Sequence, residues 1–129
     1  MLTAVHHAQV SIPIGSEDEA RSFYCGILGM TEIPKPASLA GRGGFWLELS
    51  GFQIHFGTED GIDRSRSKAH LAYQVSDLES WRERLDRAGC TIVDGIPIPG
   101  NHRFEFRDPF GNRVEFLEKM DSGSDPTPV

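Results

Sequence analysis

The chain contains two stretches of similar sequence, and this duplication limits the folds that it can adopt. His7 opens the segment His-Ala-Gln-Val-Ser-Ile, and His70 opens the segment His-Leu-Ala-Tyr-Gln-Val. Further along each copy, His55 lies in Gly-Phe-Gln-Ile-His-Phe, and Glu115 holds the same place in Gly-Asn-Arg-Val-Glu-Phe. A pattern that returns at nearly constant spacing predicts two copies of one structural module. A potential metal ligand stands at each of the matched positions.

The first copy has the pattern of a βαβββ module. Apolar and polar residues alternate from Val5 to Ile12, which is typical of a half-buried strand. Ser16 lies three residues before Glu19, the spacing of a capping box, and predicts the start of a helix that ends at Gly29. The other segments that we expect to be strands are 31–33, 45–50 and 53–57.

The second copy repeats this order, with a strand that opens at His70 and a helix that the capping-box pair Ser76 and Glu79 starts. We therefore expect an α+β fold of two paired βαβββ modules with curled mixed sheets. Segment 35–44 follows Pro34, contains Pro36 and three glycines, and is expected to be a mobile loop and a candidate lid. The expected boundaries are 1–57 for the first module, 58–69 for a linker, 70–120 for the second module and 121–129 for a disordered tail.

The parity of the strands places the potential ligands on one kind of surface. Side chains in a strand alternate between the two faces of its sheet. The apolar residues of each strand form the face that an amphipathic helix would cover. His7, His55, His70 and Glu115 fall on the opposite, polar faces. Two curled sheets of this kind would enclose a cleft lined by these four side chains.

Imidazole nitrogens and a carboxylate suit a divalent metal such as Fe, Mn, Ni, Co or Zn. We expect His7, His70 and Glu115 to be metal ligands and His55 to be a fourth ligand, a base or a substrate contact. Three protein ligands leave positions open for water or substrate, as in catalytic sites. A single histidine in a strand is more often only a hydrogen-bonded neighbour, and His6 and His102 are assigned to that class.

Other polar residues near these positions are candidates for catalysis or substrate binding. With a two-residue turn at Gly51-Phe52, Glu48 would lie directly across from His55 and could orient it or act as a base. The expected catalytic residues are thus Glu115, His55 and Glu48. The expected substrate-binding residues are Trp46, which shares the face of His55, and Arg103 and Arg113, since arginine binds carboxylate or phosphate groups bidentately. The two arginines are equally compatible with being exposed strand charges.

Composition excludes several classes of partner. The 129 residues carry a net charge of −6, whereas non-specific nucleic-acid binding needs a basic surface. No apolar run approaches the ~20 residues of a membrane span. We expect a cytoplasmic protein that binds neither nucleic acid nor membranes, with Cys25 and Cys90 as reduced thiols.

The chain resembles the vicinal oxygen chelate superfamily over residues of about 5 to 119. The resemblance rests on the His7 and His70 openings, on Phe-Tyr before Leu-Gly29, and on Phe-Arg-Asp-Pro-Phe-Gly-Asn-Arg-Val-Glu115-Phe. It implies paired βαβββ modules in a homodimer, a divalent metal held by His7, His70 and Glu115, and a small substrate with two vicinal oxygens. His55 stands where glyoxalase I has a glutamate and methylmalonyl-CoA epimerase has a glutamine.

The resemblance is compatible with two kinds of function. The first is a metal-dependent enzyme of isomerase, lyase or dioxygenase type, similar to glyoxalases and dioxygenases. The second is a metal-free drug-binding protein of the bleomycin-resistance type, which would capture an aromatic, cationic ligand and would suit an acidic chain.

Overall fold

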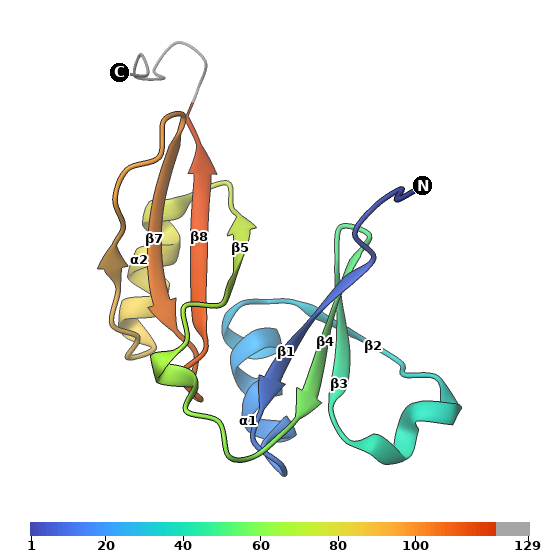
Figure 1. Ribbon diagram of the computed structural model, residues 1–129. Coiled ribbons are helices and arrows are strands. Elements are labelled where there is room, and N and C mark those ends of the chain that lie inside the picture. The colour runs from blue at the N-terminus through green and yellow to red at the C-terminus, as the bar shows by residue number, and fades with distance from the viewer. Residues whose placement is uncertain (121–129) are drawn as a thin grey trace. The chain divides into compact units, whose positions relative to one another are not determined.

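The computed structural model describes residues 1–120 of the chain, and the expected tail, 121–129, lies outside the described residues. By its internal contacts the chain divides into two compact units (Figure 1). Unit 1 comprises Met1–Ile62, and unit 2 begins at Asp63. The division falls inside segment 58–69.

Unit 1 has the predicted βαβββ order. Its sheet runs β1-β4-β3-β2, with β1 parallel to β4 and the other neighbours antiparallel. Its elements are β1 (His7–Ile12), α1 (Glu17–Arg21), η1 (Ser22–Ile27), β2 (Thr31–Ile33), η2 (Ala37–Arg42), β3 (Phe45–Leu49) and β4 (Phe52–Thr58).

The helix of unit 1 starts where the sequence predicts, but its capping box does not form. The Ser16 hydroxyl donates to the carbonyl oxygen of Pro13 at 2.6 Å, so it makes no side-chain cap to α1. The helix continues through the wider π-helical turns of η1 and ends before Gly29, whose φ of 78° is left-handed as expected. Its apolar face packs on the sheet, where the Tyr24 ring lies 4.6 Å from that of Phe56.

The hairpin between β3 and β4 turns one residue earlier than expected. Ser50 and Gly51 both have positive φ, 50° and 80°, as a two-residue type I′ turn requires. This turn pairs Trp46 with His55 and Glu48 with Gln53. The expectation that Glu48 lies across from His55 is therefore wrong.

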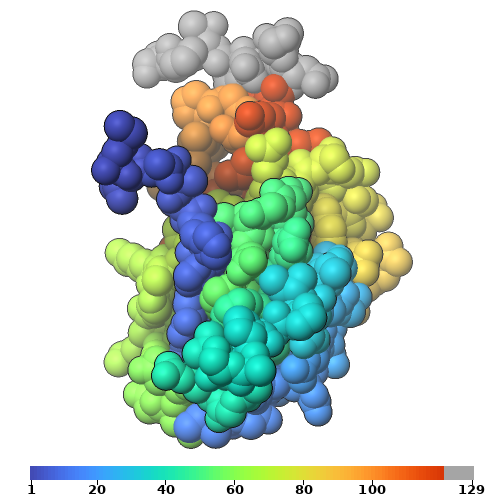
Figure 2. Space-filling view, turned by 90° about the vertical axis from the view of Figure 1, so that its right-hand side faces the viewer, coloured from blue at the N-terminus to red at the C-terminus, as the bar shows by residue number. Residues whose placement is uncertain are grey.

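Segment 35–44, expected to be a loop, contains the 3-10 helix η2 and is fastened at both ends. Lys35 Nζ donates to the carbonyl oxygen of Gly43 at 2.6 Å, and the Gly44 N–H donates to Glu17 Oε2 at 3.1 Å. A Cβ on Gly44 would lie 1.9 Å from the Phe56 carbonyl oxygen, so only glycine fits there. The segment (turquoise) forms part of the surface in Figure 2.

Unit 2 repeats the topology, with sheet order β5-β8-β7-β6 and with α2 against one face (Figure 1). Asp77, rather than Ser76, caps α2, since its carboxylate accepts from the Ser80 N–H at 3.2 Å. The elements of unit 2 are η3 (Arg64–Arg66), β5 (His70–Gln74), α2 (Leu78–Arg87), β6 (Val93–Asp94), β7 (Asn101–Arg107) and β8 (Arg113–Lys119).

Aromatic side chains form the core between α2 and its sheet. The Phe116 ring is central, with the rings of Trp81 and Phe106 at 5.2 Å and 5.0 Å in edge-to-face contact. Both units thus carry a four-stranded mixed sheet with a helix on its apolar face, which confirms the α+β prediction of two βαβββ modules. Among the described residues, no helix is long and apolar enough to cross a membrane.

Candidate functional site

The polar face of unit 1 carries a stack of three rings. β4 lies between β1 and β3, and each of these strands contributes one ring to the same face. The His55 ring lies 4.0 Å from the His7 ring and 3.8 Å from Trp46, with interplanar angles of 18° and 1°. Covered on both sides, His55 is only 7% exposed.

This environment favours neutral His55. Burial lowers the pKa of the imidazole below its ordinary value of 6.5, and the positive charges of His7, His6 and Lys35 lower it further. His55 Nε2 lies 2.9 Å from Gln53 Oε1, an acceptor, so Nε2 carries the proton and Nδ1 carries the lone pair. Glu48, the expected partner, is exposed and contributes nothing to this arrangement.

A cavity of about 560 Å³ opens on this face of unit 1. His6, His7, Trp46 and His55 line it, and segment 35–44 adds the cations Lys35 and Arg42. No aspartate or glutamate among the described residues takes part in the lining. Sequence reasoning missed both cations, although they lie within the segment that was predicted as a lid.

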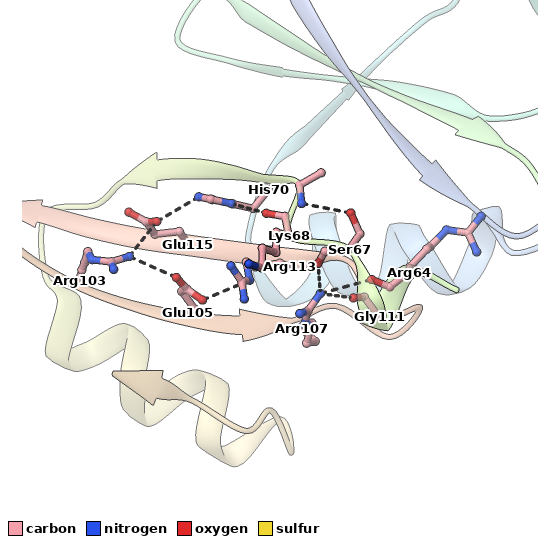
Figure 3. A network of polar contacts seen from close by, with 11 residues as sticks. Arg64, Ser67, Lys68, His70, Arg103, Glu105, Arg107, Gly111, Arg113 and Glu115 are labelled. Atoms are coloured by element: carbon pink, nitrogen blue, oxygen red, sulfur yellow. Dashed lines mark hydrogen bonds and ion pairs between the residues drawn. The ribbon is translucent and has the colours of Figure 1, made fainter. Parts of the chain in front are cut away.

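The polar face of unit 2 brings together the other two expected ligands (Figure 3). His70 Nε2 lies 3.2 Å from Oε1 of Glu115, whose side chain is 6% exposed. His70 Nδ1 lies 2.9 Å from the carbonyl oxygen of Lys68. A carbonyl oxygen only accepts, so Nδ1 donates to it, and Nε2 is the ring nitrogen that faces the Glu115 carboxylate.

Arg103 is built into this cluster. Its Nη1 lies 3.0 Å from Glu115 Oε1 and 3.2 Å from Glu105 Oε1, and its Nε donates to the Ile96 carbonyl oxygen at 2.9 Å. Gly95 makes this approach possible, because a Cβ there would lie 2.6 Å from the Arg103 guanidinium carbon. The residue expected to bind substrate is thus held by two carboxylates of its own chain.

Arg113 is engaged in the same way, with its Nε 3.3 Å from Glu105 Oε2 (Figure 3). Sequence reasoning missed Glu105, whose place two residues after Arg103 on β7 is the signal that could have identified it, since both side chains point to one face. Arg107 donates to the carbonyl oxygens of Arg64, Ser67 and Gly111 and holds the backbone around η3.

The donor chemistry fits a divalent metal, with two of the expected ligands in each unit. In unit 2 an imidazole nitrogen, His70 Nε2, and a carboxylate oxygen, Glu115 Oε1, lie 3.2 Å apart, and both are atom types that bind such a metal. A ring N–H given to a backbone carbonyl, as in His70, is the usual way that a metal-binding histidine is oriented. Within neither unit do the described residues gather three or more His, Cys, Asp or Glu side chains that could hold a metal.

The two remaining histidines differ in position. His6 Nδ1 lies 3.0 Å from His7 Nδ1, and His6 lines the cavity of unit 1. His102 lies on β7 opposite Glu118 and is exposed. His6 is therefore a hydrogen-bonded neighbour as expected, but it also borders the candidate site.

Comparisons with known proteins agree with this architecture. The sequence profile of the Glyoxalase/Bleomycin resistance protein/Dioxygenase superfamily matches residues 4–116. A Bacillus anthracis crystal structure described as a glyoxalase family protein is 38% identical, with a TM-score of 0.85 over 93% of this chain and 98% of that one. Glyoxylase I 4 of Arabidopsis thaliana is 27% identical, over 88% of this chain and 70% of its own length.

The fold is shared more widely. A fosfomycin resistance protein from Listeria monocytogenes, in a complex with Mn(II) and sulfate, is 16% identical, with a TM-score of 0.75 over 93% of each chain. The profile match over most of the chain, together with the paired βαβββ modules, decides the family. The protein belongs to the Glyoxalase/Bleomycin resistance protein/Dioxygenase superfamily, whose fold is that of the vicinal oxygen chelate proteins.

Proposed function

We propose that the protein is a metal-dependent enzyme that acts on a small substrate through two vicinal oxygen atoms, with His7, His70 and Glu115 as metal ligands. The observation that carries this proposal is the facing pair in unit 2, His70 Nε2 and Glu115 Oε1 at 3.2 Å. The Lys68 carbonyl accepts from Nδ1 and so orients the ring with Nε2 toward the carboxylate.

The chain's own residues have separable roles in this proposal. A divalent Fe, Mn, Ni, Co or Zn ion, when bound, would act as a Lewis acid that stabilises negative charge developing on the substrate oxygens. His55, kept neutral by burial, is a fourth ligand or accepts a proton from the substrate at Nδ1. The Trp46 ring stacks on the His55 ring and fixes its orientation. Arg103 positions Glu115 through Nη1, and its own Nε is held by the Ile96 carbonyl oxygen.

Isomerase, lyase and dioxygenase reactions all suit this ligand set, and the family supports a cytoplasmic homodimer. The alternative, a metal-free drug-binding protein, is disfavoured by the cavity of unit 1. That function was expected to capture a cationic ligand, but Lys35 and Arg42 line this cavity and would repel one.

Metal analysis of protein purified without chelator tests the proposal, followed by a screen of the metal-loaded protein. We expect about one equivalent of divalent metal per chain. We also expect turnover in one of three substrate classes, namely methylglyoxal–thiol adducts, catechols and acyl-CoA epimers. Less than about 0.1 equivalents, with no gain on adding Fe, Mn, Ni or Zn, would rule out the metal-dependent enzyme.

A further inference from the structure

We propose, on the basis of the proposed function, that the cavity of unit 1 binds the anionic group of the substrate, a carboxylate or a phosphate-type group, through Lys35 and Arg42. The chain carries a net charge of −6, with 19 acidic residues against 13 basic ones. The cavity nevertheless combines these two cations with three histidines, and no described Asp or Glu lines it. A positive pocket in an acidic protein concentrates anions and repels cations.

The cations of this cavity differ from those of unit 2. Arg103 and Arg113 are paired with carboxylates of their own chain. Among the described residues, no carboxylate lies within ion-pair distance of Lys35 or Arg42. The nearby Glu17 carboxylate accepts from the Gly44 backbone N–H instead. The positive charges of Lys35 and Arg42 are therefore not neutralised by a described carboxylate and can act on a bound ligand.

Lys35 is also held in place before any ligand arrives. Its ammonium donates one hydrogen bond to the Gly43 carbonyl oxygen at 2.6 Å, which leaves two N–H donors. The bond spans segment 35–43 and fixes the half-buried side chain at the wall of the cavity. Ordering the cation in advance reduces the entropy lost on binding.

The other residues that line the cavity indicate what the non-anionic part of the ligand is like. Trp46 and Leu39 supply apolar surface, and Gln9 and Gln53 supply amides. A volume of about 560 Å³ lies within the range of small-molecule sites. The expected ligand is a small molecule with one anionic group and an apolar or planar body.

Three probes of similar size and different charge test this assignment: phenylphosphonate, neutral benzyl alcohol and cationic benzyltrimethylammonium. Calorimetry at constant ionic strength measures their affinities. Fluorescence in a Trp81→Phe background locates binding, because Trp46 is then the sole tryptophan and lines the cavity. We expect phenylphosphonate to bind at least about tenfold more tightly than the other two and to change the Trp46 emission.

Lys35→Gln and Arg42→Gln should each weaken phenylphosphonate binding about tenfold or more, because each removes a charge-assisted hydrogen bond. Lys119→Gln, the same change at an exposed lysine of β8, is the matched control and should bind as wild type does. Equal affinity for the three probes, tighter binding of the cation, or an equal loss in Lys119→Gln would overturn the assignment.

Metal titration of the same variants separates this inference from the proposed function. Lys35→Gln and Arg42→Gln should bind metal as wild type does, because neither residue is a proposed ligand. Metal binding without preference for the anionic probe would overturn the inference alone. Preference for the anionic probe without metal binding would overturn the proposed function alone.

Discussion

His70 and Glu115 face each other across unit 2 with Nε2 3.2 Å from Oε1, and Arg103 Nη1 lies 3.0 Å from the same carboxylate oxygen. Glu115 Oε1 therefore contacts both His70 and Arg103. The Glu115 carboxylate is buried, and among the described residues it is the only one in ion-pair contact with His70. Two consequences follow. Glu115 depends on Arg103 for its place, and the Glu115 carboxylate is the group that His70 Nε2 faces.

Replacing Arg103 should cost the protein stability, because it leaves Glu115 and Glu105 as buried or half-buried carboxylates without their shared cation. We expect Arg103→Ala to lower the free energy of unfolding by about 2–4 kcal/mol. Arg113→Ala, which removes one contact of 3.3 Å at a more exposed side chain, should cost less than about 1 kcal/mol. Urea unfolding measures both, and equal losses would contradict the central place of Arg103.

The fastening of segment 35–44 is tested by two glycines within it. Gly44→Ala places a Cβ 1.9 Å from the Phe56 carbonyl oxygen at a φ of 78°, and should cost at least about 2 kcal/mol of unfolding free energy. Gly41→Ala is the matched control, because no atom lies within 4 Å of its Cβ, and should change stability by less than about 1 kcal/mol. If Gly44→Ala is as stable as Gly41→Ala, the segment is not pinned against β4.

His55 should make the stability of the metal-free protein depend on pH. Its folded pKa is lowered below the ordinary 6.5, mainly by burial, so the folded state disfavours the extra proton. The stability contribution is complete above pH 6.5 and is lost as pH falls through the lowered folded pKa. Urea unfolding at a series of pH values should show this loss in wild type and a smaller one in His55→Gln. The same pH dependence in both proteins would show that His55 does not cause it.

Much of this fold follows from local sequence patterns. The alternation of apolar and polar residues in β1, β4, β5 and β8 is a property of each strand alone, so it correctly predicted both modules and their polar faces. The predicted starts of α1 and α2 lay close to the observed ones, because capping signals are also local. The capping bonds differ, since Ser16 donates to Pro13 and Asp77 caps α2.

The errors concern relations between segments. The register of the hairpin depends on its turn. Ser50 has a φ of 50°, but serine is not among the residues that usually adopt a positive φ, so the sequence did not predict a turn there. Because the turn lies one residue earlier than predicted, Glu48 pairs with Gln53, and Trp46 pairs with His55 and stacks on its ring. The pairing of Arg103 with Glu115 likewise needs the β7–β8 alignment and the space at Gly95, which no single strand pattern encodes.

Calorimetric titration of the purified protein with Mn²⁺ and Zn²⁺ tests the proposed ligands most directly. Wild type and His102→Ala should bind about one equivalent with similar affinity, and His70→Ala and His7→Ala should lose about 100-fold or more. Circular dichroism checks that all variants are folded. Equal affinity in all four proteins, or no binding in wild type, would contradict the assignment of His7, His70 and Glu115 as the metal site.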